Sequence, residues 1–360
     1  MTEKVVVGMS GGVDSSVAAY LLKKQGYDVI GVTMQIWQED DRETLENEGG
    51  CCGFSAVDDA RAVAAKIGIP YYVLNFKKEF KEYVIDYFID EYVKGATPNP
   101  CIACNRYVKW EVLLSKALQI GADYIATGHY ARVVKHPVTG RYTLKLAETD
   151  KKDQTYALYN LTQEQLKHTL MPIGDYEKED VRKIAEDIGL VVAHKPDSQD
   201  ICFVKDNDYG GFIRENSDYE IKTGNFVDFD GNILGTHKGI SQYTIGQRKG
   251  LGLAFGKPMY VCEIRPETNE VVIGENKDLF KREVIIRDFN FMAFEPKDGE
   301  YKVYGKIRYS QKKAPCTITV KGTDVVCVFD EPQRAITPGQ AAVFYDDEYI
   351  VGGGTIVKWF

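Results

Sequence analysis

The chain has 360 residues with 45 basic and 53 acidic side chains, which gives a formal net charge of −8. Apolar residues make up 44% and charged residues 27%, and these ordinary globular values exclude a wholly disordered chain. The eight cysteines are too few for a disulfide scaffold. The acidic total argues only weakly against a nucleic-acid partner, because net charge does not describe local patches.

The N-terminal sequence carries no recognisable export or membrane signal. Its apolar stretch is only Val5–Val7, much shorter than the core of a signal peptide. No segment approaches the roughly 18 uncharged apolar residues of a membrane helix. We therefore expect a cytoplasmic protein without a membrane partner, in which thiols stay reduced and cysteines react, bind metal or pack.

The first half of the chain alternates short β-rich runs with helical patterns, as in βαβ units with a parallel sheet. The predicted strands are Lys4–Val7, Tyr27–Met34, Tyr71–Phe76 and Asp123–Thr127. The predicted helices are Asp14–Gln25, Asp58–Ile67, Lys77–Val93 and Asn105–Gln119. We assign residues 1–150 to this α/β domain, and ligands of such sheets bind at the carboxyl ends of the strands.

The remaining chain predicts a small helical region followed by β structure. Residues 151–208 are expected to be mainly helical, with helices at Leu161–Leu170 and Lys178–Ile188. Turn signals then bound short β-rich runs, which favours small barrels or a sandwich. We expect a small β-rich module over residues 209–280 and a C-terminal β-barrel over residues 281–360. The expected strands are Gly224–Phe229, Met259–Ile264, Val271–Ile273, Tyr301–Ile307, Thr317–Val320, Val325–Phe329, Ala342–Tyr345 and Tyr349–Val351.

A glycine- and serine-rich loop follows the first predicted strand and opens a helix. It reads Gly8-Met9-Ser10-Gly11-Gly12-Val13-Asp14-Ser15. Glycines let the backbone approach an anion, and the helix N-terminus supplies unpaired N–H groups. The lysine of a Walker A loop is absent. An ordinary βα turn is the alternative, but this pattern directly after a first strand favours a phosphate site.

This segment resembles the pyrophosphatase loop of the PP-loop ATP pyrophosphatases. Members of that superfamily cleave ATP between the α- and β-phosphates and adenylate a substrate oxygen. The resemblance implies that the loop holds the phosphates of ATP. It also implies that Asp14 lies near Mg²⁺, which shields phosphate charge during the transfer.

Three cysteines in polar segments are candidates for chemistry. Cys101 and Cys104 lie in TPNPCIACN, and Cys202 lies in KPDSQDICF. We expect Cys104 near the start of a helix, where the helix dipole favours the thiolate. The spacing alone leaves a zinc site, a three-cysteine iron–sulfur site and a sulfur-carrying thiol pair nearly tied.

The other five cysteines are expected to have no chemical role. Cys262, Cys316 and Cys327 occur in β-rich, apolar surroundings and are expected to be buried and inert. Cys51 and Cys52 lie in an acidic loop, where an unassigned role is favoured over metal binding.

From end to end, the chain resembles a tRNA-specific 2-thiouridylase (tRNA-uridine 2-sulfurtransferase). The matching stretches are GMSGGVDSS, VTMQIW, TPNPCIACN, ATGHYA, KKDQTY, KPDSQDICF, GQRKGLG, KIRYSQ and TPGQAAVFY. The resemblance implies Cys104 as nucleophile and Cys202 as the persulfide-bearing cysteine. It implies tRNA as a partner, with a cysteine desulfurase or a sulfur-relay protein as the sulfur source.

The same resemblance implies a set of binding residues. Contacts with ATP are implied for Gly8 to Ser15, Met34 and Gly128. Contacts with the target base are implied for Asn99, Pro100 and Cys101. Contacts with tRNA are implied for His129, Lys152, Asp153, Gln154, Arg308, Tyr309 and Gln340.

The activity implied is the ATP-dependent exchange of oxygen for sulfur at carbon 2 of the wobble uridine. Cys101 stands where many family members carry aspartate, so its CxxC keeps iron–sulfur-dependent thiolation of the same base open as an alternative. A second alternative is another PP-loop adenylating ligase, which would need ATP but no cysteine. Apart from Mg²⁺ and this possible cluster, we expect no metal.

Two stretches of the chain are basic although its net charge is negative. Residues 301–323 contain six lysines and arginines and no acid, and residues 231–262 contain four and no acid. Such runs supply phosphate contacts in nucleic-acid-binding proteins. A solvated strand face is the alternative, but beside the thiouridylase resemblance these stretches favour tRNA binding.

Overall fold

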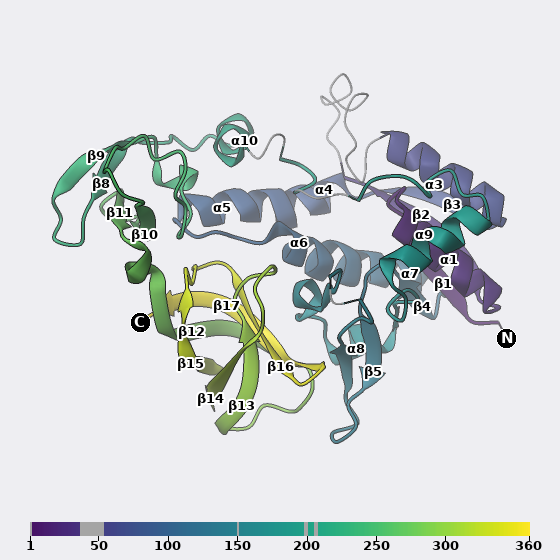
Figure 1. Ribbon diagram of the computed structural model, residues 1–360. Helices are drawn as coiled ribbons and strands as arrows, with labels where there is room; N and C mark the ends of the chain where they lie inside the picture. Colours follow the sequence, from purple (N-terminus) through teal and green to yellow (C-terminus); the bar gives the residue numbers. More distant parts are fainter. Residues whose placement is uncertain (1, 37–53, 150, 198–200, 205–207) are drawn as a thin grey trace.

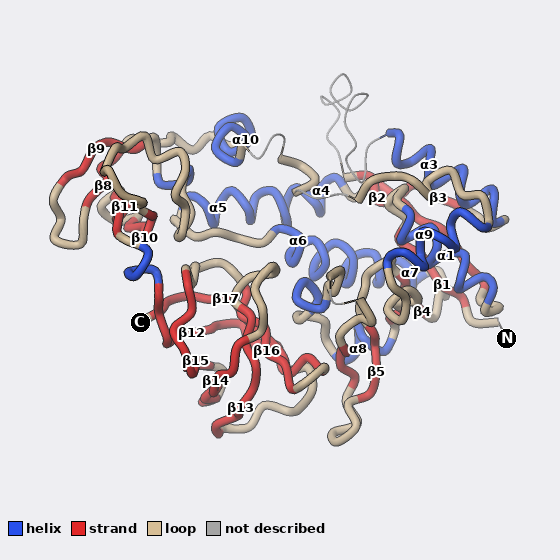
Figure 2. Tube along the Cα trace, viewed as in Figure 1, coloured by secondary structure: helices blue, strands red, loops and turns tan. Residues whose placement is uncertain are grey.

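The computed structural model describes residues 2–36, 54–149, 151–197, 201–204 and 208–360. Figure 1 shows an elongated molecule with an α/β unit at one end and two β units at the other. Figure 2 shows the same division, with most helices in the first part and most strands in the second. Cys51 and Cys52 lie outside the described residues. No helix of the described part is long and apolar enough to cross a membrane.

The α/β unit is built on a five-stranded parallel sheet of order β3-β2-β1-β4-β7. Its strands are β1 (Lys4–Gly8), β2 (Asp28–Gln35), β3 (Tyr71–Asn75), β4 (Tyr124–Ala126) and β7 (Thr169–Leu170). The first four confirm the predicted strands to within one residue at each end.

Helices cover both faces of this sheet. One face carries α1 (Val13–Lys24), α3 (Phe54–Ile67) and α9 (Lys178–Asp187). The other carries α4 (Lys77–Phe80), which continues through a π-helical stretch (Lys81–Asp86) into α5 (Tyr87–Val93). Val5 and Val7 of β1 pack with the first group and Val6 with the second, because successive side chains of a strand point to opposite faces.

The cysteine-bearing helix begins earlier than the sequence predicts. It starts as α6 (Pro100–Ala103), continues as a π-helical stretch (Cys104–Leu113) and ends as α7 (Leu114–Gln119). Asn99 caps it, since its Oδ1 accepts from the backbone N–H of Cys101 at 3.1 Å and of Ile102 at 3.3 Å. Proline is well suited to the first helical position. Cys104 therefore lies one turn into the helix, and Cys101 occupies the first turn.

The helix expected at Leu161–Leu170 is also wrong in part. Only α8 (Gln163–Lys167) is helical, and Thr169 and Leu170 form the edge strand β7 beside β4. Thr169 is fixed in this strand because its Oγ1 accepts a buried hydrogen bond from Trp110 Nε1 at 2.7 Å. At these two residues, pairing with the sheet outweighs the local helical periodicity of the sequence. The second expected helix is confirmed as α9.

Residues after 208 form two β units, as expected. After the short helix α10 (Tyr209–Asn216), a four-stranded sheet of order β10-β11-β8-β9 forms the small module, and six further strands close into a barrel through the pairing of β12 with β17. The module contains β8 (Gly224–Val227), β9 (Ile233–His237), β10 (Tyr260–Arg265) and β11 (Glu270–Gly274). The barrel contains β12 (Phe280–Phe291), β13 (Gly299–Lys306), β14 (Ala314–Lys321), β15 (Asp324–Arg334), β16 (Ala341–Asp346) and β17 (Tyr349–Trp359).

The barrel is fastened to the α/β unit by a shared core and by strand pairing. A hairpin absent from the sequence prediction, β5 (Arg132–Lys135) and β6 (Tyr142–Lys145), extends the barrel sheet through the contact of β6 with β17. Val343 and Tyr345 of β16 belong to the same buried cluster as Trp110. The barrel is therefore held in a fixed position beside the cysteine-bearing helix.

Asn290 tests this fastening. Its Nδ2 donates to the carbonyl oxygens of Tyr159 at 2.7 Å and Leu161 at 3.0 Å, across the junction of barrel and α/β unit. Asn290→Ala should lower the free energy of unfolding by about 1–3 kcal/mol, because buried carbonyls lose their donor. Urea denaturation measures this. Asn216→Ala, which removes an exposed bond within α10, should cost less than about 0.5 kcal/mol, and equal losses would contradict the fastening.

Candidate active site

The phosphate loop leaves no room for a side chain at Gly11, directly before the start of α1. Gly11 has φ +69°, and a Cβ at this position would lie 2.3 Å from the carbonyl oxygen of Ala56. Gly12 caps α1 without a side-chain hydrogen bond. The first N–H groups of α1 are therefore open to an anion, whose charge the helix dipole favours.

Residues predicted to contact ATP converge at the carboxyl ends of β1, β2 and β4. A Cβ on Gly128, which follows β4, would lie 2.5 Å from the backbone nitrogen of Ser15, so Gly128 packs directly against the start of α1. Met34 is half-buried near the end of β2. Met9 and Val13 are each 2% exposed, so they can offer a ligand only their backbone. This is the edge where parallel sheets bind ligands.

Asp14, in the first turn of α1, is held by two side chains that sequence reasoning missed. The hydroxyl of Tyr130 donates to its Oδ1 at 2.7 Å. The Nζ of Lys178, from the start of α9, lies 2.7 Å from Oδ1 and 2.9 Å from Oδ2. Burial, together with the charge and hydrogen bond of Asp14, raises the pKa of Tyr130 far above its usual range, so this hydroxyl remains a donor.

Asp197, shortly before Cys202, is the second carboxylate of this network. Its Oδ1 lies 2.8 Å from Lys178 Nζ and 3.0 Å from Arg182 Nη2, and its Oδ2 accepts from Lys152 at 2.8 Å. Burial alone would raise the pKa of Asp197, but its bonds to Lys152 and Lys178 outweigh burial and lower it to about 2. Asp197 is therefore a stable anion at neutral pH.

A second link joins the same segment to the loop. Lys195 Nζ donates to the carbonyl oxygen of Gly11 at 3.2 Å and pairs with Asp59 at 2.7 Å. Lys195 and Asp197 stand within the KPDSQDICF stretch that the sequence analysis singled out for its cysteine. The sequence holds one signal that Lys178 has a specific role. A lysine at the start of a predicted helix opposes the helix dipole, so its position there needs another reason.

The three candidate cysteines differ in exposure. Cys101 is exposed, whereas Cys104 and Cys202 are half-buried and pack against the same core cluster. Cys104 begins the π-helical stretch of its helix, a feature that often marks functional sites. Cys262, Cys316 and Cys327 are buried, as expected. Within the described residues, no three His, Cys, Asp or Glu side chains are grouped to hold a metal ion.

A cavity of about 270 Å³ lies where the α/β unit, the small module and the barrel meet. Arg308 Nη2 donates to the carbonyl oxygen of Ile245 at 2.9 Å, and Gln340 Nε2 donates to that of Thr97 at 2.8 Å. Burial, followed by the charges of Asp153 and Cys101, raises the pKa of Tyr309. Three predicted tRNA contacts therefore line one cavity beside the Asn99–Cys101 turn.

The other residues predicted to contact tRNA make bonds within the protein. His129 Nδ1 lies 2.7 Å from Thr127 Oγ1, and burial with the nearby charge of Lys109 lowers the pKa of His129 well below its usual range. The carboxylate of Asp153 accepts from the backbone N–H of Ala147 at 2.9 Å. Gln154 Oε1 accepts from the backbone N–H of Tyr130 at 2.9 Å, so Gln154 supports the tyrosine that holds Asp14.

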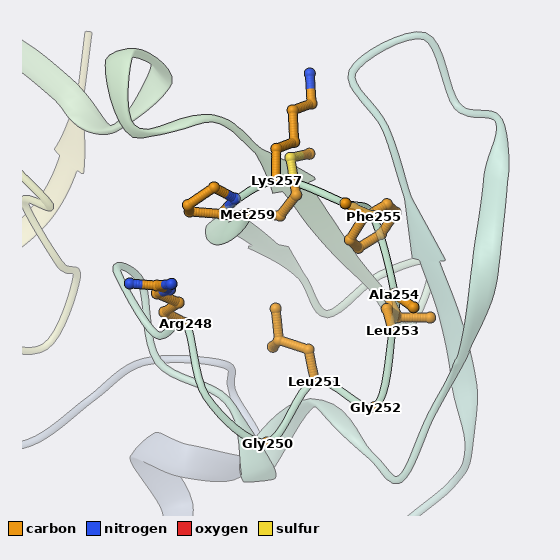
Figure 3. A pocket seen from close by; sticks show the side chains of 11 residues that line it. Arg248, Gly250, Leu251, Gly252, Leu253, Ala254, Phe255, Lys257 and Met259 are labelled. Carbon is orange, nitrogen blue, oxygen red and sulfur yellow. The ribbon is translucent and has the colours of Figure 1, made fainter.

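The basic stretches are mostly solvent-facing. In residues 231–262 the basic side chains are all exposed: Lys238, Arg248, Lys249 and Lys257. In residues 301–323, Lys302, Lys312, Lys313 and Lys321 are exposed, whereas Lys306 and Arg308 are partly buried. Figure 3 shows the loop of residues 248–259, where Arg248 and Lys257 line a cavity of about 630 Å³.

The fold defines an α/β enzyme with two appended β units, and three family models match these units. The tRNA methyl transferase HUP domain matches residues 3–206, the tRNA methyl transferase PRC-barrel domain residues 212–275, and the aminomethyltransferase beta-barrel domain residues 281–356. Among solved structures, the NMN synthetase of Francisella tularensis is 15% identical with a TM-score of 0.33, over 54% of this chain and 66% of that chain.

Full-length relatives are far more similar. A protein of Lachnoclostridium phytofermentans named tRNA-specific 2-thiouridylase MnmA is 65% identical over 99% of this chain and 100% of its own length. Proteins of the same name from Clostridioides difficile and Acetivibrio thermocellus are 63% and 61% identical, covering 99% and 98% of this chain and 99% of each relative. The chain belongs to the tRNA-specific 2-thiouridylase family.

Gly128 tests the geometry of the phosphate loop. Gly128→Ala places a methyl group against the backbone of Ser15, so it should displace the start of α1 and weaken ATP binding by about tenfold or more. Isothermal calorimetry measures the affinity. Gly121→Ala meets no atom within 4 Å and strains only its own backbone, at φ +75°, so it controls for the loss of a glycine and should leave ATP affinity unchanged. If both variants bound ATP as tightly as wild type, Gly128 would not border the nucleotide site.

Proposed function

We propose that this protein uses ATP to replace the oxygen at carbon 2 of the wobble uridine of tRNA with sulfur. The observation that carries the proposal is the combination of a lysine-free phosphate loop with two half-buried cysteines on one core cluster. Support also comes from the named 2-thiouridylase that is 65% identical over nearly the full chain. A ligase of the same superfamily would not require the cysteines.

The phosphates of ATP are assigned to the loop of residues 8–15. The open N–H groups at the start of α1 are suited to oxygens of a phosphate. Lys178 and Lys195, which lie within 3.2 Å of atoms in or beside the loop, supply the positive charge that a Walker lysine would give elsewhere. Met34 and Gly128 are assigned to the remainder of the nucleotide.

Magnesium fits this site only together with the nucleotide. Asp14 offers one carboxylate, already bound by Lys178 and Tyr130, and the described residues contain no group of three metal-binding side chains. Such a donor set suits an ion that keeps its waters and is shared with substrate phosphates. When bound, Mg²⁺ shields phosphate charge, and Asp14 is the residue that would hold it.

The cysteines are assigned to sulfur transfer after the base is activated. The carbon-2 oxygen of uridine bonds to the α-phosphorus of ATP, and pyrophosphate leaves. The terminal sulfur of a Cys202 persulfide then bonds to carbon 2, and AMP leaves with the oxygen. Cys104 forms a disulfide with Cys202 as the transferred sulfur departs, and an external reductant restores both thiols by exchange.

The target base and tRNA are assigned to the junction of the three units. A wobble uridine must leave its stack to reach a pocket, which costs a few kcal/mol. Support comes from the cavity that Arg308, Tyr309 and Gln340 line together with Thr97, which lies just before Asn99, Pro100 and Cys101 in the chain. In this assignment residues 1–150 bind ATP, residues 151–208 carry the persulfide, and residues 209–280 and 281–360 contact tRNA.

The sulfur must come from a partner protein. A cysteine desulfurase or a relay protein is the class of donor that loads a persulfide onto Cys202. The reducing cytoplasm, where exposed thiols persist, is the compartment that we assign.

Cys202→Ser separates the two half-reactions. With ATP, magnesium, tRNA and a sulfur donor, wild type should form 2-thiouridine in hydrolysed tRNA, detected by mass spectrometry. In Cys202→Ser the rate of 2-thiouridine formation should be lower by at least about a thousandfold, because a serine cannot carry sulfane sulfur. It should still release pyrophosphate, since no predicted ATP contact is changed.

The control is Cys327→Ala, which alters a thiol in the barrel core and should thiolate normally. Normal 2-thiouridine formation by Cys202→Ser would refute its role as sulfur carrier. Iron and a visible absorbance band in anaerobically purified protein, both lost in Cys101→Ser, would instead favour the iron–sulfur alternative.

A further inference from the structure

Cys101 is the exposed member of the three candidate cysteines, and it lies one turn before Cys104 in the same helix. Cys104 and Cys202 are both half-buried. The rate at which a thiol attacks a disulfide depends on access to the sulfur atoms. A disulfide between Cys104 and Cys202 therefore presents less of its sulfur to a reductant in solution than a disulfide that includes Cys101.

The helix brings Cys101 and Cys104 together. The backbone N–H of Cys104 donates to the carbonyl oxygens of Pro100 and Cys101, so the helical backbone is continuous between the two cysteines. Side chains at this spacing are neighbours on one face of a helix. Helical side chains also lean toward the N-terminus, so that of Cys104 leans toward Cys101. A C-x-x-C pair is the arrangement by which disulfide oxidoreductases exchange disulfides.

The turn that carries Cys101 is held from both sides. Within the turn, Asn99 Oδ1 accepts from the backbone N–H of Cys101 at 3.1 Å. From the barrel, Gln340 Nε2 donates to the carbonyl oxygen of Thr97 at 2.8 Å. The turn is thereby fixed in place beside Cys104, and a nucleophile that is held in place reacts much faster than one in solution.

We propose that Cys101 is a resolving thiol that resets the cysteine pair after each sulfur transfer. The inference rests on the proposed function, because it takes the disulfide between Cys104 and Cys202 from that reaction. The thiol of Cys101 loses its proton to solvent, and its sulfur bonds to Sγ of Cys104. The bond between Cys104 and Cys202 breaks, and Cys202 leaves with the electron pair as a thiolate. This exchange moves the disulfide and consumes no reductant.

The new disulfide joins Cys101 and Cys104 in the first turns of the helix. A low-molecular-weight thiol attacks Sγ of Cys101, and Cys104 leaves as a thiolate. A second molecule of the reductant then releases Cys101 and forms the reductant's own disulfide, which completes the two-electron reduction. Cys202 is already a thiol at this stage and can accept the next sulfur from the donor.

The test locates the disulfide after a single turnover of persulfide-loaded enzyme with ATP, magnesium and tRNA, in the absence of reductant. Acid stops the exchange, and N-ethylmaleimide caps the remaining thiols. Trypsin then leaves Cys101 and Cys104 on one peptide, residues 95–106, and Cys202 on another. In wild type, mass spectrometry should find most of the disulfide within the first peptide and Cys202 capped. In Cys101→Ser the disulfide should join the two peptides, because the exchange cannot occur.

The rate of reduction is a second measurement. Glutathione should reduce oxidised wild type about tenfold or more faster than oxidised Cys101→Ser, since the variant offers only its half-buried disulfide. The measured quantity is the return of a Cys104 thiol that maleimide caps. Cys327→Ala is the control, since it removes a thiol of the barrel core, and it should match wild type in both measurements. If Cys101→Ser does not turn over, the location of the disulfide in wild type decides the question alone.

The nucleosides of the same reaction separate the two possible failures. Wild type that forms no 2-thiouridine would count against the proposed function itself. Wild type that forms 2-thiouridine but keeps its disulfide between Cys104 and Cys202, with Cys101 capped, would overturn the resolving role alone. Equal rates of reduction in wild type and Cys101→Ser would overturn it as well.

Discussion

The arrangement of the α/β unit depends on how one buried cation is neutralised. The ammonium of Lys178 requires carboxylates, and it finds one on the phosphate loop and one on the segment before Cys202. These partners come from parts of the chain that are far apart in sequence. The ammonium therefore ties α1 and α9 to residues 193–197, because without these carboxylates it would be a buried unpaired charge. The loop of residues 8–15 and the residues before Cys202 are thereby joined by one ionic network.

The β units complete the site from the opposite side. The hairpin β5–β6 continues the barrel sheet, and residues of β16 share a core with the cysteine-bearing helix. Gln340 from the barrel holds the turn that precedes Asn99. A site for a large substrate is thus built at a junction whose parts cannot shift independently. This explains why predicted tRNA contacts that are more than 200 residues from Asn99 in sequence gather beside Cys101.

Much of this architecture could be predicted from the sequence because its signals are local. The strands of the parallel sheet are short β-rich runs bounded by turns, and the loop after β1 carries its own motif. The sequence predicts helix at Thr169 and Leu170 because pairing with β4 is a long-range effect that periodicity does not contain. The roles of Lys178 and Tyr130 depend on partners more than 100 residues away. The helix start at Pro100 could have been found, since Asn99 followed by proline is a capping signal.

The central claim is that the carbon-2 oxygen of the wobble uridine is adenylated before sulfur enters. Its most direct test is a single turnover with tRNA that carries oxygen-18 at that carbon, followed by mass analysis of the released AMP. The account predicts that AMP contains the label and pyrophosphate does not, since the oxygen leaves the base bound to the α-phosphorus. Formation of 2-thiouridine with unlabelled AMP would contradict it.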